Sequence, residues 1–281
     1  MAVDINLTTF FAYARKAPFG NRLTQEQIDG ISVILDAWNS AFPSGKSDLR
    51  HLAYVLATVF HETGGRMVPV REGFAKSDAA ARKIVKDRAY GVEDPNTHQV
   101  YYGRGLVQIT WGQNYKKLGD ILGVDLLGTP DLALEPQLSA EILIEGMTKG
   151  RSGRGDFTGT SVEDHFNDKA DDPVNARKII NRLDKAGLVA SYHKNFLDAL
   201  HAGETSTPQP AVKPEDAVAD APSLATDKTF LGAIGSVVSA SGAGLLTAVN
   251  NPWALGAVAL VVVFGFLLVT GRLEIRRKGG A

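Results

Sequence analysis

His61-Glu62-Thr63-Gly64-Gly65 closes a segment whose apolar residues recur at the spacing of an α-helix. The apolar positions run from Leu49 to Phe60, and the two glycines that follow are typical helix stops. This pattern predicts a buried helix with Glu62 in its last turn. A second carboxylate, Glu72, follows after the glycine turn. The two glutamates are therefore the first candidates for a chemical site.

The sequence around this stretch predicts further helices and a mainly α fold. Thr24-Gln25-Glu26-Gln27 has the form of a capping box before a helix that ends at Pro43, and Ser47 and Ser77 stand where caps are expected. The segment Leu106–Trp111 is expected to be a short strand or an extended turn. The other predicted helices cover residues 79–88, 114–122, 136–148, 173–183 and 188–200.

Composition excludes several classes of function. The chain has 281 residues, 44% apolar residues and a net charge of −1, so no basic field indicates a nucleic-acid partner. The absence of cysteine excludes disulfides and thiolate metal sites. An ordinary cleaved export signal is not expected, because Asp4 stands where such a signal is basic and no apolar region follows.

Changes in composition predict the domain organisation. Residues 1–202 are expected to form the folded domain. Residues 203–228 contain four prolines among small and polar residues, with no aromatic residue, which is typical of a disordered linker. Residues 229–271 contain no charged residue, and residues 272–281 form a basic tail.

The uncharged stretch predicts one or two membrane helices. Asn250-Asn251-Pro252 divides it into residues 231–249 and 253–270, each close to the roughly 20 residues that cross a bilayer. The second half is strongly apolar. The first half is rich in Gly, Ala and Ser at four-residue spacing, which fits close helix–helix association but also a flexible stretch. The basic tail predicts a cytoplasmic C-terminus, so the folded domain is cytoplasmic with two spans and external with one.

The motifs do not fit a zinc-protease site or a dinucleotide-binding site. A zinc-protease helix needs a second histidine three residues after Glu62, and Gly65 stands there. A dinucleotide fingerprint begun by Gly103-Arg104-Gly105 needs glycine where Gln108 stands. Paired carboxylates fit glycoside hydrolysis instead, which uses one acid and one base. An apolar setting at a helix C-terminus favours the neutral acid form of Glu62, whereas Glu72 lies in a more polar stretch and suits the base.

The ordered motifs resemble those of glycoside hydrolase family 19. They are the stretch His61–Gly65, then Tyr102–Trp111 with Asn114-Tyr115, then Ala176–Asn181. The resemblance covers about residues 4 to 201, and its most specific part is the block that ends at Trp111. The family contains chitinases and phage endolysins that cut peptidoglycan. The resemblance implies a helical, lysozyme-like fold of two lobes around a cleft, with no metal and no organic cofactor.

The resemblance also implies catalytic roles. Glu62 matches the general acid, Glu72 matches the general base of the bacterial and phage branch, and Thr110 matches a hydroxyl residue that holds the attacking water. Glu93 is the alternative base. Family members invert the anomeric carbon, which fits a water placed between separated carboxylates.

Further residues match positions that bind substrate, line the cleft or support the motif. Gln108, Asn114 and Asn181 match residues that bind sugar, and Tyr102 and Arg104 match the motif's structural and cleft-lining positions. The chain lacks the disulfides and the longer loop of plant-type chitinases, which favours the endolysin branch. It also lacks the glycines that commonly follow the Asn181 position.

Three other residues are candidates from their chemistry, each with a structural alternative. His61 can orient Glu62 by hydrogen bonding or simply pack at the helix end. Arg177 can pair with a catalytic carboxylate or lie at the surface. Trp111 can stack on a sugar ring or belong to the core.

The sequence thus predicts a phage endolysin that hydrolyses β-1,4 bonds of peptidoglycan and causes host lysis. The alternatives are a chitinase acting on N-acetylglucosamine polymers and a non-catalytic wall-binding protein anchored in the membrane. The expected partners are the glycan, membrane lipid through the C-terminal segment and another copy of the same membrane helices. The expected location is the bacterial inner membrane, with the catalytic domain in the cytoplasm before lysis.

Overall fold

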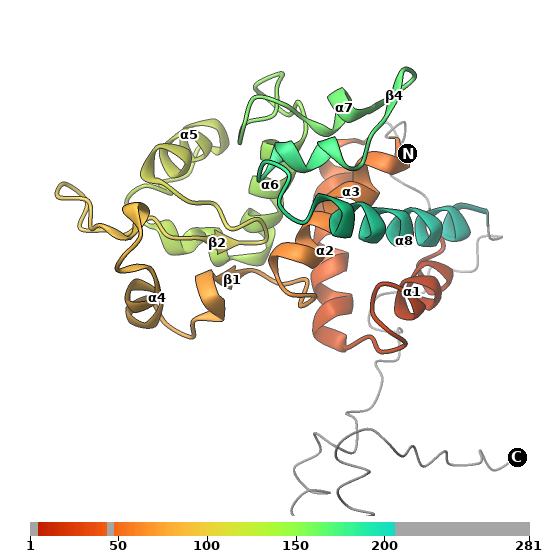
Figure 1. Ribbon diagram of the computed structural model, residues 1–281, viewed down its shortest axis with the longest axis horizontal. Helices are drawn as coiled ribbons and strands as arrows, with labels where there is room; N and C mark the ends of the chain where they lie inside the picture. The colour runs from red at the N-terminus through yellow and green to blue at the C-terminus, as the bar shows by residue number, and fades with distance from the viewer. Residues whose placement is uncertain (1–4, 44–47, 206–281) are drawn as a thin grey trace, which may run out of the picture. The chain divides into compact units, whose positions relative to one another are not determined.

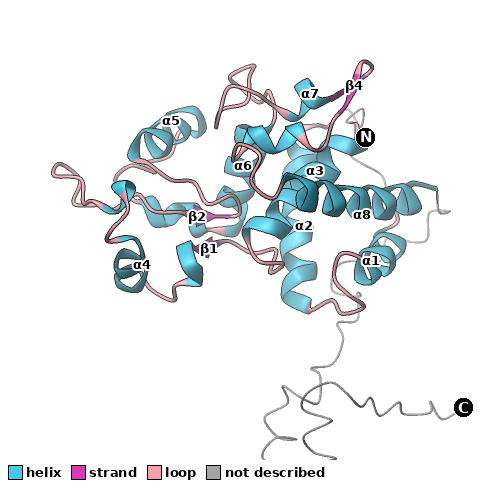
Figure 2. Ribbon diagram, viewed as in Figure 1, coloured by secondary structure: helices cyan, strands magenta, loops and turns pink. Residues whose placement is uncertain are grey.

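The computed structural model describes residues 5–43 and 48–205, and this part of the chain is mainly helical, as predicted (Figure 2). Two short antiparallel pairs join β1 (Val70–Arg71) to β2 (Arg104–Gly105) and β3 (Phe166–Asn167) to β4 (Ala170–Asp171). The α-helices are α1 (Leu7–Lys16), α2 (Gln25–Ala41), α3 (Leu49–Glu62), α4 (Asp78–Val85), α5 (Gly112–Leu122), α6 (Pro136–Met147), α7 (Val162–His165) and α8 (Ala186–Thr205). The 3₁₀ turns are η1 (Glu72–Phe74), η2 (Ala89–Gly91), η3 (Pro130–Leu134) and η4 (Asn175–Ile179).

Side-chain caps begin several of these helices. The predicted capping box of α2 is confirmed, because the Thr24 hydroxyl accepts from the Gln27 amide and the Gln27 side chain accepts from the Thr24 amide. Ser77 caps α4, as predicted. Ser47 lies outside the described residues, and Asp48 caps α3 by accepting from the amide of Arg50 at 2.9 Å.

The predicted helix over residues 173–183 is wrong. The structure has only the short 3₁₀ turn η4 in this segment. The Arg177 side chain turns inward, where its Nε donates to the Asp184 carbonyl oxygen at 3.0 Å, and Lys185 has a φ of 55°. A left-handed residue ends a helical run, so the regular helix α8 begins only at Ala186.

The helices form two groups, which Figure 1 shows on the two sides of the molecule. One group contains α1, α2, α3 and α8, with α3 and α1 both packed on α8. The other group contains α4, α5 and the β1–β2 pair. Helix α6 contacts α2, α3 and α5, and therefore connects the groups through the main apolar core. The largest core side chains include Trp38, Tyr54, Tyr115, Phe166 and Phe196.

The C-terminal predictions fall almost entirely outside the described residues. The predicted linker starts at residue 203, whereas α8 continues to Thr205. Both predicted membrane segments, 231–249 and 253–270, lie beyond the part of the chain that is described. Among the described helices, none combines the length and the apolar character that crossing a bilayer requires.

Candidate active site

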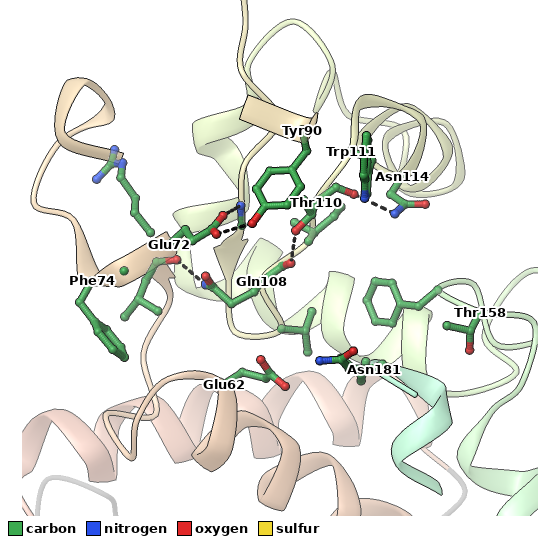
Figure 3. Close-up of a pocket in the computed structure, with 18 residues that line it drawn as sticks. Glu62, Glu72, Phe74, Tyr90, Gln108, Thr110, Trp111, Asn114, Thr158 and Asn181 are labelled. Carbon is green, nitrogen blue, oxygen red and sulfur yellow. Dashed lines mark hydrogen bonds between the residues drawn. The ribbon is translucent and has the colours of Figure 1, made fainter. Parts of the chain in front are cut away.

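A cavity of about 600 Å³ lies between the two groups of helices and contains most of the predicted site residues (Figure 3). Its walls come from the end of α3, the β1–η1 segment, the turn before α5, and the loops around residues 157 and 180. Seven predicted site residues line it: Glu62, Glu72, Gln108, Thr110, Trp111, Asn114 and Asn181. The fold therefore brings together residues that are up to 119 positions apart in the sequence (181 − 62).

Glu62 is the last residue of α3, as predicted. Its side chain is 17% exposed, and its Oε1 accepts a hydrogen bond from Nη1 of Arg177 at 2.7 Å in an ion pair. Arg177 is itself almost completely buried. The surroundings of Glu62 thus differ from the purely apolar setting that the sequence predicted, since a guanidinium group orients the carboxyl group.

Glu72 approaches the cavity from the opposite wall (Figure 3). Its Oε1 accepts from the Tyr90 hydroxyl at 2.6 Å, and its Oε2 accepts from the backbone amide of Gly103 at 2.9 Å. The Glu72 amide in turn donates to the Gly103 carbonyl oxygen at 2.7 Å. Two donors on the carboxyl oxygens fix the orientation of the Glu72 carboxyl group, as the role of a general base requires.

Tyr90 is held as a hydrogen-bond donor by its surroundings. Burial, followed by the hydrogen bond to Glu72, raises the pKa of Tyr90 to about 12. The phenol therefore remains protonated below about pH 12, and over that range it keeps donating to Glu72.

A chain of hydrogen bonds orders the wall from Gln108 to Asn114. The Gln108 side-chain amide donates to the Val70 carbonyl oxygen at 2.9 Å. The Thr110 hydroxyl donates to the Gln108 carbonyl oxygen at 2.8 Å, and the Asn114 side-chain amide donates to the Thr110 carbonyl oxygen at 2.8 Å. Because the Thr110 proton is used in this way, its oxygen is available to accept a hydrogen bond from a water in the cavity.

Trp111 lies at the edge of the cavity rather than in the core. Its side chain is 45% exposed, and its ring meets the Tyr90 ring edge-on at 5.6 Å. The backbone of Trp111 has a φ of 73°, and that of Gln108 has a φ of 54°. Non-glycine residues adopt this region at a cost in free energy, so the fold holds two neighbouring cavity residues in a strained conformation.

Tyr102 and Arg104 do not line the cavity. Both side chains are buried, and the Arg104 guanidinium lies 3.6 Å from the centroid of the Tyr102 ring. Arg104 forms ion pairs with Asp78 at 3.2 Å and with Asp131 at 2.7 Å, and Asp131 also pairs with Arg71 at 2.6 Å. These ion pairs anchor β1 through Arg71 and β2 through Arg104.

His61 and Glu93 also lie outside the cavity lining. Burial lowers the pKa of His61, while the nearby Glu62 charge opposes that effect. The alternative base Glu93 pairs with Arg82 at 2.8 Å and with His98 at 3.3 Å. Among the described residues, no group of His, Asp and Glu side chains could hold a metal ion.

Among the cavity residues that sequence reasoning did not identify are Phe74, Tyr90, Phe157 and Thr158. Tyr90 lies in a segment that the sequence presents as irregular, and Phe74 follows Glu72 at the end of η1. Phe157 and Thr158 come from a loop distant in sequence from the motifs. For Phe74 alone the sequence held an indication, because an aromatic residue follows the predicted base Glu72 after one glycine.

Comparison with known proteins supports the motif-based resemblance. Residues 37–147 match the Glyco_hydro_19 family model, chitinase class I. Residues 37–147 are therefore similar to the family 19 glycoside hydrolases. The matched residues include both glutamates of the cavity and the wall from Gln108 to Asn114, whereas Arg177 and Asn181 lie beyond them.

Curated endochitinases are similar to this chain over part of their length. Endochitinase 2 of Gossypium hirsutum is 36% identical over 97 residues, which are 32% of this chain and 32% of that protein. Endochitinase CH5B of Phaseolus vulgaris is 38% identical over 90 residues, which are 30% of this chain and 27% of that protein. The chain thus spans about a third of the length of these relatives.

Solved structures of chitinases also resemble the chain. Chitinase C from Streptomyces griseus has a TM-score of 0.46 and 22% sequence identity, over 71% of this chain and 77% of that one. A bacterial family 19 chitinase has a TM-score of 0.42 and 22% identity, over 74% of this chain and 98% of that one.

Proposed function

We propose that this chain is a glycosidase that hydrolyses β-1,4 bonds between N-acetylated sugars, with Glu62 as acid and Glu72 as base. The observation that carries the proposal is the entry of these two carboxyl groups into one cavity from opposite walls. A glycosidic bond that lies between them meets an acid on one side and a base on the other, as hydrolysis with inversion requires. The match of residues 37–147 to the family 19 model supports the same reaction.

In the proposed reaction, protonated Glu62 gives its proton to the glycosidic oxygen as the bond to the anomeric carbon breaks. Arg177 binds Oε1 of Glu62, so Oε2 is the oxygen that carries the proton. Glu72 takes a proton from a water whose oxygen forms the new bond to the opposite face of that carbon. The Thr110 oxygen accepts the other hydrogen of this water. Afterwards Glu62 regains a proton from solvent and Glu72 releases one.

The proposed substrate is peptidoglycan, cleaved between N-acetylmuramic acid and N-acetylglucosamine, which makes the protein an endolysin. The second candidate is an N-acetylglucosamine polymer, and the similarity to endochitinases favours it. The same acid and base serve either glycan, because the two differ in a substituent on alternate sugars and not at the bond that is cut.

Product analysis tests both the proposed reaction and the proposed substrate. We expect the full chain to release new reducing ends from purified peptidoglycan, from N-acetylglucosamine oligomers or from both, with the product first formed as the inverted anomer. Glu62→Gln should abolish release while glycan binding persists, and Tyr13→Phe, a change at an exposed position on α1, is the matched control. Equal turnover by Glu62→Gln and the unaltered chain would contradict the assignment. Binding without turnover by the unaltered chain would point to the wall-binding alternative.

We also propose that residues 229–271 anchor the protein in the bacterial inner membrane. The absence of charge over this stretch and the basic residues that follow it support the proposal. The full chain should float with lipid vesicles, whereas a chain ending at residue 228 should not. Protease protection of residues 272–281 in spheroplasts would place the C-terminus inside and then give the side of the catalytic domain.

A further inference from the structure

Phe74 is an aromatic residue at the cavity for which the proposed reaction has no role. It lies two positions after Glu72, its side chain is 44% exposed, and it lines the cavity. Figure 3 shows Phe74 and Trp111 on opposite sides of Glu72. Exposure of a large aromatic side chain in a cavity is the usual property of a binding surface.

The backbone at Phe74 is strained. Its φ is 58°, and that of the preceding Gly73 is 62°. Glycine adopts this conformation freely, but phenylalanine adopts it at a cost in free energy. Phe74 and Trp111 share this combination of a positive φ, an exposed ring and a position in the cavity. Such strain concentrates at functional sites, where the surrounding structure maintains it.

Contacts from the His61–Gly65 turn and the residue after it fix the Phe74 ring. A Cβ atom added at Gly64 would lie 3.0 Å from the Phe74 Cζ, so the ring rests directly on a position without a side chain. The Arg66 guanidinium covers the ring at 4.2 Å from its centroid. The ring is therefore held in place, with the rest of its surface available at the mouth of the cavity.

We propose that Phe74 is a substrate-binding residue that stacks on the apolar face of a sugar ring, at the end of the cavity opposite Trp111. This inference rests on the proposed function, and it assigns a sugar position on each side of the bond that Glu62 and Glu72 cleave. A β-linked N-acetylhexosamine has an apolar face of C–H groups, and removing that face from water against an aromatic ring favours binding. Because Phe74 lies away from the reacting bond, it contributes to binding of long oligomers more than to turnover.

Phe74→Gly in the full chain separates this role from a structural one, because it relieves the backbone strain while it removes the ring. We expect a KM about tenfold higher for long N-acetylglucosamine oligomers, with little change in kcat and no loss of thermal stability. Short oligomers that cannot reach both aromatic rings should show a smaller effect. Phe74→Tyr should retain the KM of the unaltered chain.

The matched control is Ile84→Ala, since Ile84 is 51% exposed and adjoins Gly73 but does not line the cavity. It should leave KM unchanged. If the unaltered chain cleaves the oligomers and Phe74→Gly does so with an unchanged KM, Phe74 does not bind sugar and the glycosidase assignment still holds. If the unaltered chain neither cleaves nor binds N-acetylglucosamine oligomers or peptidoglycan, both proposals fall.

Discussion

The Tyr90 hydroxyl donates a 2.6 Å hydrogen bond to Oε1 of Glu72 and thereby fixes the direction of the candidate base. Neither residue is next to the other in sequence or in secondary structure, since Glu72 begins η1 and Tyr90 lies in η2. Both residues line the cavity.

Tyr90→Phe removes a hydrogen bond to a charged group while keeping the aromatic ring beside Trp111. Hydrogen bonds of this kind contribute about 1.5–3 kcal/mol, so we expect kcat/KM to fall about tenfold to a hundredfold. Steady-state kinetics on a soluble oligomer provides the measurement. Tyr13→Phe, at an exposed position, should have no effect. An unchanged kcat/KM in Tyr90→Phe would show that Gly103 alone positions Glu72.

Arg177→Met leaves the Glu62 carboxyl group without its 2.7 Å ion-pair partner. Removing one member of a buried pair typically costs about 3–5 kcal/mol, because the remaining charge is uncompensated. We expect a lower free energy of unfolding by about 3 kcal/mol in urea titrations, together with loss of activity. In a chain that already carries Glu62→Gln, Arg177→Met should lower the free energy of unfolding by a smaller amount. Equal costs in both backgrounds would mean that the two side chains are not coupled.

Arg104→Lys distinguishes a structural role from the predicted role in the cleft. Lysine cannot replace a guanidinium group that binds Asp78 and Asp131 at the same time. We expect a loss of about 3 kcal/mol in the free energy of unfolding, with KM unchanged for the folded fraction. A raised KM without loss of stability would restore the cleft-lining interpretation.

Stability should fall at alkaline pH because of buried tyrosines. Burial, aided by the hydrogen bond to Asp78, raises the pKa of Tyr102 to about 12, and burial also raises the pKa values of Tyr54 and Tyr115. In the unfolded chain these groups ionise near pH 10, so the unfolded state binds fewer protons than the folded state above that pH. Stability is therefore complete below about pH 10 and is lost as the pH rises through the range between about 10 and 12. Melting temperatures across this range provide the check, and Tyr102→Phe should show a shallower decline.

The sequence predicted the parts of the fold that local chemistry determines. The capping box at Thr24, the cap at Ser77 and the position of Glu62 in the last turn of its helix follow from residue types at fixed spacing. The segment around Arg177 was misassigned as a helix, because a side chain drawn to Glu62 from 115 positions away overrides the local pattern.

The same distinction applies to the candidate site. Thr110 and Asn114 lie in the cavity as the motif predicted. Their positions depend on local contacts, because the two residues are close in sequence and are joined by a hydrogen bond. Tyr90 and Phe74 were missed, because their positions depend on a tertiary hydrogen bond and on a positive φ that residue type does not indicate. Tyr102 belongs to the same motif, but its side chain is buried against Arg104 and does not line the cavity.

The two candidate catalytic glutamates, Glu62 and Glu72, belong to elements that differ in length and in packing. Glu62 ends a helix of 14 residues that packs on α8 in the core, whereas Glu72 follows a strand of two residues paired with another of two. We expect hydrogen exchange to be slower along α3 than along β1 and β2, and equal rates would contradict this. We therefore expect changes in the distance between the two carboxyl groups to come from movement of Glu72, with Glu62 held in place by α3.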